Sequence, residues 1–589
     1  MTLYKIKISN RNYETWEVYN ATTMEPILID DLNPINHKLL NDDVFIYNKG
    51  KVEIVKSSIR THENIAAVLI LDNNKTYGRE NKNSFKNLPT KEGKLLYKCV
   101  PNDPSIPIFL VPYEIKQMGF SKVFNNLYVT IRFNHWLEKH PRGILSQTIG
   151  PVDIIQNFYD YQLYCKNLNI SIQQFNKNTT NSIKQKAQVH DSFITEICKK
   201  YPNIEDRTSW KTFTIDPDGS QDFDDGFSIK KLLTGGNKTL LSIYISNVSI
   251  WLDCLNLWSV FSERISTIYL PNKKIPMLPN LLSDCLCSLQ SNTRRFAFTM
   301  DIILDSDFNI VSINYANCLI KVFKNFWYEE PSLLNDSDYK YLLDTTTILS
   351  SKYKYVSIHD SHDVVSYLMI FMNHHCAKEL LKNKKGIFRS VSKKEHDKHL
   401  LPPTLPNDVS QFLKIFTSTS GQYITLENSP EENLLQLCRH ETLELEAYIH
   451  ITSPIRRIVD LLNMIQFQIN SQLFSLSEDA LQFYSTWILK IDYINSSMRS
   501  IRQLQNDCNL LDLCFNNRDV IDKIYDGYCF EKNLTSNNLF QYMVFLPELR
   551  ISSRIIINHD FDNFTQHKFK LFLFNDEEKF KKKIRLQLI

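Results

Sequence analysis

The chain has 589 residues, of which 43% are hydrophobic and 23% are charged, and its formal net charge is +3. This length is too great for one hydrophobic core, so we expect three or four domains, and the weak charge excludes a globally basic nucleic-acid binder. The 12 cysteines form no Cys-x-x-Cys pair, which argues against structural zinc and a disulfide framework. The sequence shows neither a signal-peptide core nor an apolar run of transmembrane length. We therefore expect a reducing compartment, the cytoplasm or alternatively the nucleus, and no membrane partner.

Short apolar segments open the chain. Residues 1–94 and 95–170 alternate runs such as YKIKIS, KVEIV and IPIFLVP with turns rich in Asn, Asp and Gly. Short strands at this spacing are typical of small β-barrels. Aromatic side chains lie among basic ones in both stretches, which suits single-stranded nucleic acid, although the aromatic core of a barrel would explain them equally well.

A polar stretch and then the largest domain follow. Residues 171–204 read as a linker with one helix, and residues 205–515 as a mixed α and β domain that becomes helical toward its end. Apolar residues recur at helical spacing over 364–382, 431–450 and 477–515. Residues 520–589 return to short strands and predict another small barrel.

The most informative stretch runs from Thr214 to Phe227 and reads TIDPDGSQDFDDGF. Its acids are crowded among apolar residues, and they are Asp216, Asp218, Asp222, Asp224 and Asp225. Carboxylates that lose hydration are costly unless a positive charge compensates them, and the stretch contains no Lys or Arg, so a divalent cation is the natural compensation. An EF-hand loop is excluded, because Gln221 and Phe227 occupy its sixth and twelfth positions. A solvated acidic loop is the simpler alternative, which the interleaved apolar residues argue against.

A second informative stretch, ITSPIRRIVDLL, covers residues 451–462. Thr452 or Ser453 can cap a helix that begins at the following proline, so that Arg456 and Arg457 lie in its first turn. Cations there oppose the helix dipole unless an anion lies nearby, and guanidinium groups at a helix N-terminus suit phosphate. Two surface arginines without a ligand are the alternative. Arginines and a metal site can both bind phosphate, however, so their combination indicates a ligand that contains phosphate.

These motifs resemble the ribonuclease II/ribonuclease R (RNB) family of 3′→5′ exoribonucleases, closest in style to the eukaryotic exosome catalytic subunit and its relatives, without an N-terminal endonuclease domain. The family's acidic signature, D-x5-D-x-D-D, is matched by Asp216, Asp222, Asp224 and Asp225. The segment YLPNKKIPMLP resembles the next block, with Tyr269 where a ring stacks on a terminal base. LEAYIHITSPIRR resembles the block that supplies the catalytic arginine, which falls on Arg456. NHKLLNDDVFIY and IPIFLVP look like parts of two cold-shock barrels.

The resemblance implies a multidomain α+β fold, in which a mixed α/β RNB catalytic domain is flanked by small OB-fold β-barrels. The RNB domain would cover 205–515, with two cold-shock-like barrels at 1–94 and 95–170 and a C-terminal OB-like barrel at 520–589. The resemblance also implies processive hydrolysis of single-stranded RNA to nucleoside 5′-monophosphates by two Mg²⁺ ions, with Mn²⁺ as the alternative. The chain would act as a monomer unless it joins partners in an RNA-degradation complex.

The resemblance further assigns roles to single residues. Asp224 and Arg456 would be catalytic. The metal ligands would be Asp216, Asp222, Asp224 and Asp225. Substrate would be bound by Tyr269, Arg457, Thr452 and Ser453.

Several positions depart from the family's pattern, among them Tyr244, Asn247, Glu441, Thr442, Ile458, Gln505 and Asn506. They concern the RNA channel, whereas the metal ligands and Arg456 match. The second aromatic residue of the family's base clamp is not assigned. Two alternatives stay open, a catalytically silent RNB-like protein that binds RNA and regulates mRNA translation or stability, and a scaffold subunit of a degradation complex.

Overall fold

The structure is a computed structural model. It describes residues 2–589 except 49, 81–92, 116–123, 187–189, 233–236, 393–401, 403, 417–420, 427–433, 536 and 577–580. The chain forms two compact units. Unit 1 comprises Met1–Asn169, Leu270–Asn272 and Ser500–Ile589, and unit 2 comprises Ile170–Tyr269 and Lys273–Arg499. No helix in the described ranges is both long and apolar enough to cross a bilayer.

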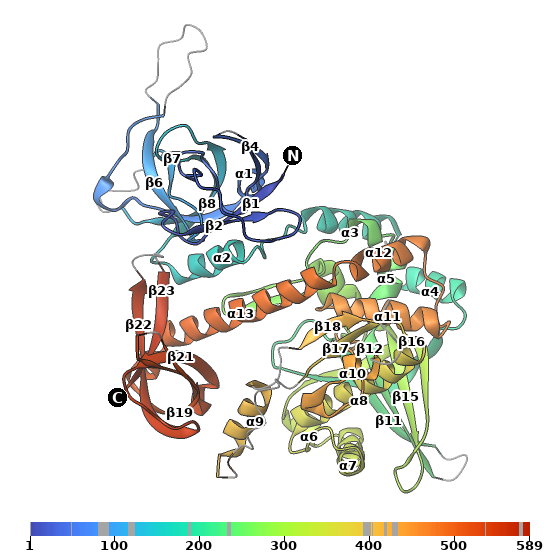
Figure 1. The fold of residues 1–589 in the computed structure, drawn as a ribbon. Coiled ribbons are helices and arrows are strands. Elements are labelled where there is room, and N and C mark those ends of the chain that lie inside the picture. Colours follow the sequence, from blue (N-terminus) through green and yellow to red (C-terminus); the bar gives the residue numbers. More distant parts are fainter. Residues whose placement is uncertain are drawn as a thin grey trace. The chain divides into compact units, whose positions relative to one another are not determined.

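Unit 1 begins with two packed β structures (Figure 1). An antiparallel sheet in the order β2-β1-β3-β4 contains β1 (Tyr4–Ile8), β2 (Trp16–Asn20), β3 (Val44–Asn48) and β4 (Lys51–Lys56). A closed barrel follows the short helix α1 (Ser58–Thr61) and contains β5 (Ile65–Leu69), β6 (Leu95–Pro101), β7 (Phe109–Tyr113), β8 (Leu127–His135) and β9 (Arg142–Pro151). Sheet and barrel share one hydrophobic core, which includes Ile6, Phe45, Tyr97 and Val129.

The boundary predicted at residue 94 does not separate these two structures. The apolar strand β5 was expected in the first barrel, but it pairs with β6 and β8 of the second. All five of its side chains are buried, because β5 has a neighbour on both edges and closes the ring. The first sheet therefore ends with β4, and the second barrel begins at Ile65.

Unit 1 also contains helices and the C-terminal sheet. The helix α2 (Ile155–Cys165) packs on the closed barrel, where the rings of Tyr161 and Tyr128 stack with centroids 4.3 Å apart. After α13 (Ile491–Asn516) and α14 (Arg518–Asp522), an antiparallel sheet runs in the order β21-β20-β19-β22-β23. Its strands are β19 (Ile524–Leu534), β20 (Phe540–Leu546), β21 (Ile551–Ile557), β22 (Thr565–Asp576) and β23 (Lys581–Leu588).

A second closed barrel forms the centre of unit 2 and is drawn mainly in green in Figure 1. Its strands, in ladder order, are β10 (Glu205–Asp216), β11 (Asp225–Leu232), β12 (Lys238–Ser246), β15 (Arg294–Leu304) and β16 (Ile310–Trp327). A parallel pairing of β10 with β16 closes the ring, in a register that sets Asp216 opposite Trp327. The apolar run LLSIYIS forms β12 because neighbours on both edges bury it almost completely.

Helices cover this barrel. The linker holds two helices, α3 (Gln173–Lys186) and α4 (His190–Lys200), where we expected one. The others are α5 (Val248–Cys254), α6 (Pro331–Leu334), α7 (Ser337–Lys352), α8 (Ser361–Lys382), α9 (Asn407–Phe416), α10 (Leu434–Cys438), α11 (Ile458–Asn470) and α12 (Glu478–Ile488). The small hairpin of β17 (Ile387–Ser390) and β18 (Gln422–Thr425) lies among them in the chain. The apolar face of α8 joins the barrel core, where Leu368 and Phe371 cluster with Phe298.

Two predicted helices differ from the structure. The described part of 431–450 is helical only at α10 and in a 3₁₀ turn over Glu441–Leu443, because Glu444 adopts a left-handed φ of 56° and the backbones of His440 and Leu445 pair. The expected helix over 477–515 is broken between α12 and α13, at the exposed Leu489.

Candidate active site

The acidic stretch forms the connection between β10 and β11. Asp216 ends one strand and Asp225 begins the next, so the antiparallel pairing of these strands keeps the acids close together. Gly219 lies at the tip with a φ of +77° and open space around it, a conformation that favours glycine. The sequence spacing of the aspartates therefore becomes a spatial cluster through one short hairpin.

All nine predicted site residues line a single cavity of about 580 Å³. They are Asp216, Asp222, Asp224, Asp225, Tyr269, Thr452, Ser453, Arg456 and Arg457. They come from three segments that are far apart in the sequence, and all three belong to unit 2.

Asp224 holds the arginine segment against the acidic hairpin. Its Oδ1 accepts the backbone N–H of Ile455 at 2.9 Å, and its Oδ2 accepts Nε of Arg456 at 3.2 Å. Burial raises the pKa of Asp224 to about 7, although Arg456 and the backbone hydrogen bond act in the opposite direction. The Arg456 side chain is 45% exposed, so it contacts the buried aspartate while remaining open to the cavity.

Asp222 is bound by a cation that the sequence motifs did not indicate. Lys274 in β14 (Lys273–Ile275) approaches Asp222 Oδ1 to 3.1 Å, and it approaches Asp284 Oδ1 to 3.0 Å. The hydroxyl of Tyr269 donates to the other Asp222 oxygen at 3.3 Å. The Tyr269 residue is 38% exposed at the cavity, as a stacking ring requires.

Asp216 and Asp225 are the two aspartates of the cluster that lack a cation in direct contact among the described residues. In each, the buried Oδ2 atom has no hydrogen-bond partner in the structure. Burial raises the pKa of Asp216 to about 7, with Asp224 adding to the rise and Thr214 opposing it. Burial and the neighbouring Asp216 raise the pKa of Asp225 to about 8. Buried carboxylate oxygens without partners fit a divalent cation with oxygen ligands.

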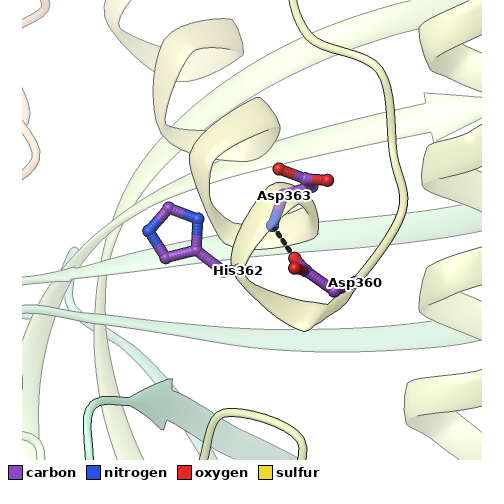
Figure 2. A group of neighbouring side chains, drawn as sticks. All are labelled: Asp360, His362 and Asp363. Atoms are coloured by element: carbon purple, nitrogen blue, oxygen red, sulfur yellow. Dashed lines mark hydrogen bonds between the residues drawn. The ribbon is translucent and has the colours of Figure 1, made fainter. Parts of the chain in front are cut away.

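A more compact acidic group has a different explanation. It consists of Asp360, His362 and Asp363, whose possible ligand atoms all lie within 4.8 Å of one another. Within the described ranges, no three carboxylates of the acidic hairpin lie as close together. Figure 2 shows the backbone N–H of Asp363 donating to Asp360, at 2.8 Å. The Asp363 carboxylate in turn accepts the N–H of His359 at 2.9 Å. Asp360 thus caps the start of α8 and Asp363 binds the residue before the cap, which explains the proximity of the two aspartates without an ion.

The arginine segment does not begin a helix where we predicted. The helix α11 starts at Ile458 with Arg457 as its extended N-cap, and neither Thr452 nor Ser453 caps it. The carbonyl of Ser453 instead accepts the N–H groups of Arg456 and Arg457 in a turn, at 3.3 and 3.0 Å. Carboxylates account for this difference, since Asp460 accepts the Ser453 N–H at 2.8 Å just as Asp224 accepts the Ile455 N–H. The two arginines therefore lie in a tight turn directly before the helix.

The two arginines of this turn have different surroundings. Arg457 lies against the fully buried Asp460, with Nε 2.8 Å from Oδ2 and Nη2 donating to Oδ1 at 2.9 Å. Arg456 donates from Nη2 to the Ser453 hydroxyl at 3.2 Å. Thr452 and Ser453 are themselves buried beside the cavity. Arg457 thus holds the turn together, and Arg456 has the more exposed guanidinium.

The arginine turn is also paired with the segment that carries Tyr269. The carbonyl of Arg456 accepts the N–H of Thr267 and the hydroxyl of Ser266, both at 2.9 Å. The N–H of Ile458 donates to the carbonyl of Ile265 at 2.9 Å. The Tyr269 ring and the Arg456 guanidinium therefore belong to two short segments that are hydrogen-bonded to each other.

The sequence motifs did not assign several other residues that line the cavity, of which Tyr328 and Asn373 contact assigned segments. Tyr328 follows β16, its N–H donates to the Asp216 carbonyl at 3.0 Å, and its ring lies 5.2 Å from that of His362. Asn373 is buried in α8, and its side chain accepts the N–H of Ile451 at 2.9 Å and donates to Tyr448 at 3.1 Å. A polar side chain within the apolar run of α8 was the available signal for Asn373.

The comparisons with known proteins agree with this geometry. The pattern of the RNB domain matches residues 204–340 and 331–474. Residues 204–474 of the chain therefore resemble an RNB domain. Ribonuclease R of Buchnera aphidicola subsp. Schizaphis graminum is 28% identical over 327 residues, which are 45% of this chain and 45% of that protein. The chain spans about half the length of the curated relatives it matches first.

Solved structures extend the likeness in fold beyond the region that matches the RNB domain. Mycoplasma genitalium RNase R in complex with ribose-methylated single-stranded RNA has a TM-score of 0.65 at 15% identity, over 100% of both chains. Yeast Ssd1, a pseudonuclease, has a TM-score of 0.55 at 14% identity, over 97% of this chain and 80% of that one. The fold is thus RNase R-like, with a mixed α/β region and several small barrel-like sheets, as the sequence predicted.

Seven departures from the family's pattern lie outside the cavity lining. They are Tyr244, Asn247, Glu441, Thr442, Ile458, Gln505 and Asn506. Asn247 caps α5, and its fully buried amide donates to Asn317 and Gln468 at 2.8 and 3.1 Å. An uncharged residue fits this network, in which every partner is itself neutral.

Proposed function

We propose that this protein is a 3′→5′ exoribonuclease that hydrolyses single-stranded RNA processively to nucleoside 5′-monophosphates, using two divalent ions, Mg²⁺ or alternatively Mn²⁺. The observation that carries the proposal is a cavity where two buried carboxylate oxygens without partners lie near the partly exposed guanidinium of Arg456. The names of the relatives, Ribonuclease R among them, and the RNB domain support the same reaction.

Each group in the cavity has a role in this reaction. Asp216, Asp222, Asp224 and Asp225 would hold the ions directly or through water. Such ions neutralise charge on phosphoryl oxygens and activate a water molecule. Arg456 would donate to the scissile phosphate, and Asp224 would keep it in position through the 3.2 Å contact.

Tyr269 would fix the end of the RNA. Its exposed ring can stack on the last base, and stacking of this kind contributes about 1–3 kcal/mol per base. The mixed aromatic and basic surfaces of unit 1 would bind the rest of the strand. M. genitalium RNase R was solved with single-stranded and with double-stranded RNA, which supports RNA as the substrate class.

A labelled-RNA assay tests the proposal. Single-stranded RNA with a 5′ label is incubated with the protein and Mg²⁺, and we expect a ladder that shortens from the 3′ end. Asp224→Asn should abolish the ladder. Asp218→Asn is the matched control, because Asp218 belongs to the same stretch but is exposed and does not line the cavity. Circular RNA should remain intact, and cutting of the circle would contradict an exonuclease.

A catalytically silent RNA-binding regulator is the second candidate. The likeness to the pseudonuclease Ssd1 favours it, as does the pairing of Asp222 and Asp224 with internal cations. The four retained aspartates favour the enzyme. Full-length RNA that stays bound but uncut in Mg²⁺ and in Mn²⁺ would establish the silent protein.

A further inference from the structure

Lys274 lies between two carboxylates, one of which belongs to the acidic cluster. Its ammonium lies 3.1 Å from Asp222 and 3.0 Å from Asp284, which belongs to the π-helical turn Leu281–Leu286. Its side chain is 24% exposed, and both carboxylates are less exposed than that, so solvent screens these contacts only in part. Asp222 lines the cavity, while neither Lys274 nor Asp284 does.

The four aspartates of the acidic cluster therefore form two pairs with different surroundings. Asp216 and Asp225 each keep a buried oxygen without a partner. Asp222 and Asp224 are each in contact with a cation from elsewhere in the chain. At the first pair an external ion finds buried oxygens without a hydrogen-bond partner, whereas at the second pair it finds a cation already in direct contact.

The two internal cations are not equivalent. Arg456 is fixed by the Ser453 hydroxyl and by the hydrogen bonds of its carbonyl. Lys274 has a compact charge on a flexible stem, and it already contacts a second carboxylate at an equal distance. Its ammonium can therefore leave Asp222 without becoming unpaired.

We propose that Lys274 competes with a divalent ion for Asp222, and that its ammonium moves fully onto Asp284 when an ion binds. The inference rests on the proposed function in one respect, that the cluster binds divalent ions. It deepens that function by naming a residue that sets the metal affinity.

Metal titration of the full chain without RNA tests the competition. We expect Lys274→Met and Lys274→Gln to bind Mn²⁺ at least tenfold more tightly than the wild-type protein, as measured by calorimetry. Lys211→Met is the matched control, because Lys211 also bridges two carboxylates, Asp336 and Asp338, at 2.8 and 3.1 Å. Its affinity should equal that of the wild type. An unchanged affinity in both Lys274 variants would overturn the inference.

A double-variant comparison separates direct competition from a general change in the field of the protein. In an Asp222→Asn background, Lys274→Met should no longer tighten Mn²⁺ binding, because the contested ligand is gone. Tightening that persists undiminished would mean that Lys274 acts only through its charge. A loss of RNA affinity with no change in metal affinity would make it a phosphate-binding residue; either result overturns the proposal.

The outcomes distinguish this inference from the proposed function. If the wild type binds ions and degrades RNA while the Lys274 variants bind with unchanged affinity, only the inference fails. If the wild type binds no ion but Lys274→Met does, the competition is supported and the nuclease proposal fails. If neither binds an ion, both fail.

Discussion

At the scale of residues, the central feature is the charge that the acidic hairpin cannot compensate by itself. Asp216 and Asp225 keep carboxyl groups in an apolar setting with raised pKa values. Each buried oxygen without a partner costs free energy of folding in the ionised form. Under the proposed function, a divalent ion would supply the missing partner, so metal binding and folding stability would be linked at these two residues.

This linkage predicts a pH effect. The pKa of Asp225 is about 8 in the folded protein, above its ordinary value, so its contribution to stability is full at acid pH and is lost as the pH rises toward 8. Asp225→Asn removes this dependence. In EDTA, the Tm of Asp225→Asn relative to that of the wild type should therefore increase between pH 5.5 and pH 8. The difference in unfolding free energy between the two proteins should change by at most about 1.4 kcal/mol per pH unit.

The same measurement with Mg²⁺ provides the control. Mg²⁺ should raise the Tm of the wild type at pH 8 and should raise that of Asp225→Asn less. Partly buried histidines such as His440, whose pKa desolvation lowers to about 4, titrate in both proteins and cancel in the difference. A Tm difference that is constant across the pH range would contradict the linkage.

At the scale of elements, the turn before α11 depends on one buried carboxylate. Asp460 accepts the Ser453 N–H and pairs with Arg457, so Asp460→Asn leaves the guanidinium without its counter-charge. Breaking such a buried pair costs about 3–5 kcal/mol. We expect a lower Tm and RNA cleavage slowed at least tenfold in single-turnover experiments, since the turn no longer fixes Arg456. Metal affinity should hardly change.

Two comparisons give this experiment its controls. Asp479→Asn removes an exposed aspartate from the first turn of α12 and should leave cleavage and Tm unchanged. Cleavage by Asp460→Asn at the wild-type rate, measured below its Tm, would show that Arg456 does not need this support.

The outer face of β22 provides a second test at this scale. Phe572 and Phe574 are 37% and 41% exposed, and they lie opposite Arg585 and Lys583 of β23. Exposed rings beside cations suit stacking with unpaired bases. The double variant Phe572→Ala/Phe574→Ala should bind single-stranded RNA at least tenfold more weakly, as measured by fluorescence anisotropy in the Asp224→Asn background.

Ile556→Ala is the matched control for that surface. It removes a similarly exposed apolar side chain from β21, but it removes no ring. If both proteins lose RNA affinity equally, general apolar contact explains the effect and stacking does not.

At the scale of the whole molecule, the weak net charge of +3 limits long-range attraction to RNA. Binding should therefore depend on local contacts between cations and phosphates. For single strands the logarithm of affinity falls with that of salt by about 0.7 per phosphate contact. In the Asp224→Asn background, Arg456→Gln should reduce this slope by about 0.7. An unchanged slope would mean that Arg456 does not touch a phosphate.

The sequence could predict the members of the site because short-range spacing creates them. The aspartates of one hairpin stay together whatever else folds around them, and the arginine turn is a continuous segment. Their family motifs then indicated that the two segments meet. Every predicted site residue accordingly lines the same cavity.

The features that could not be predicted depend on partners distant in the chain. Lys274 lies 52 residues from Asp222, and the helix start moved because Asp224 accepts an N–H that is 231 residues away. The membership of β5 likewise depends on pairing with β8. Propensity and residue spacing describe one segment by itself, whereas these three features depend on which distant segment packs against it in the folded protein.

The backbone pairing between Thr267 and Arg456 has a mechanical consequence. Tyr269 is two residues beyond Thr267, and the guanidinium belongs to Arg456. The backbone pairing therefore limits how far the ring and the guanidinium can move relative to each other. Under the proposed function, these hydrogen bonds would hold the ring that stacks on the last base and the guanidinium that binds the scissile phosphate in a fixed relative position. A nucleotide whose base does not stack on Tyr269 would then also misplace its phosphate at Arg456. Base stacking and phosphate placement would therefore depend on each other at every RNA end.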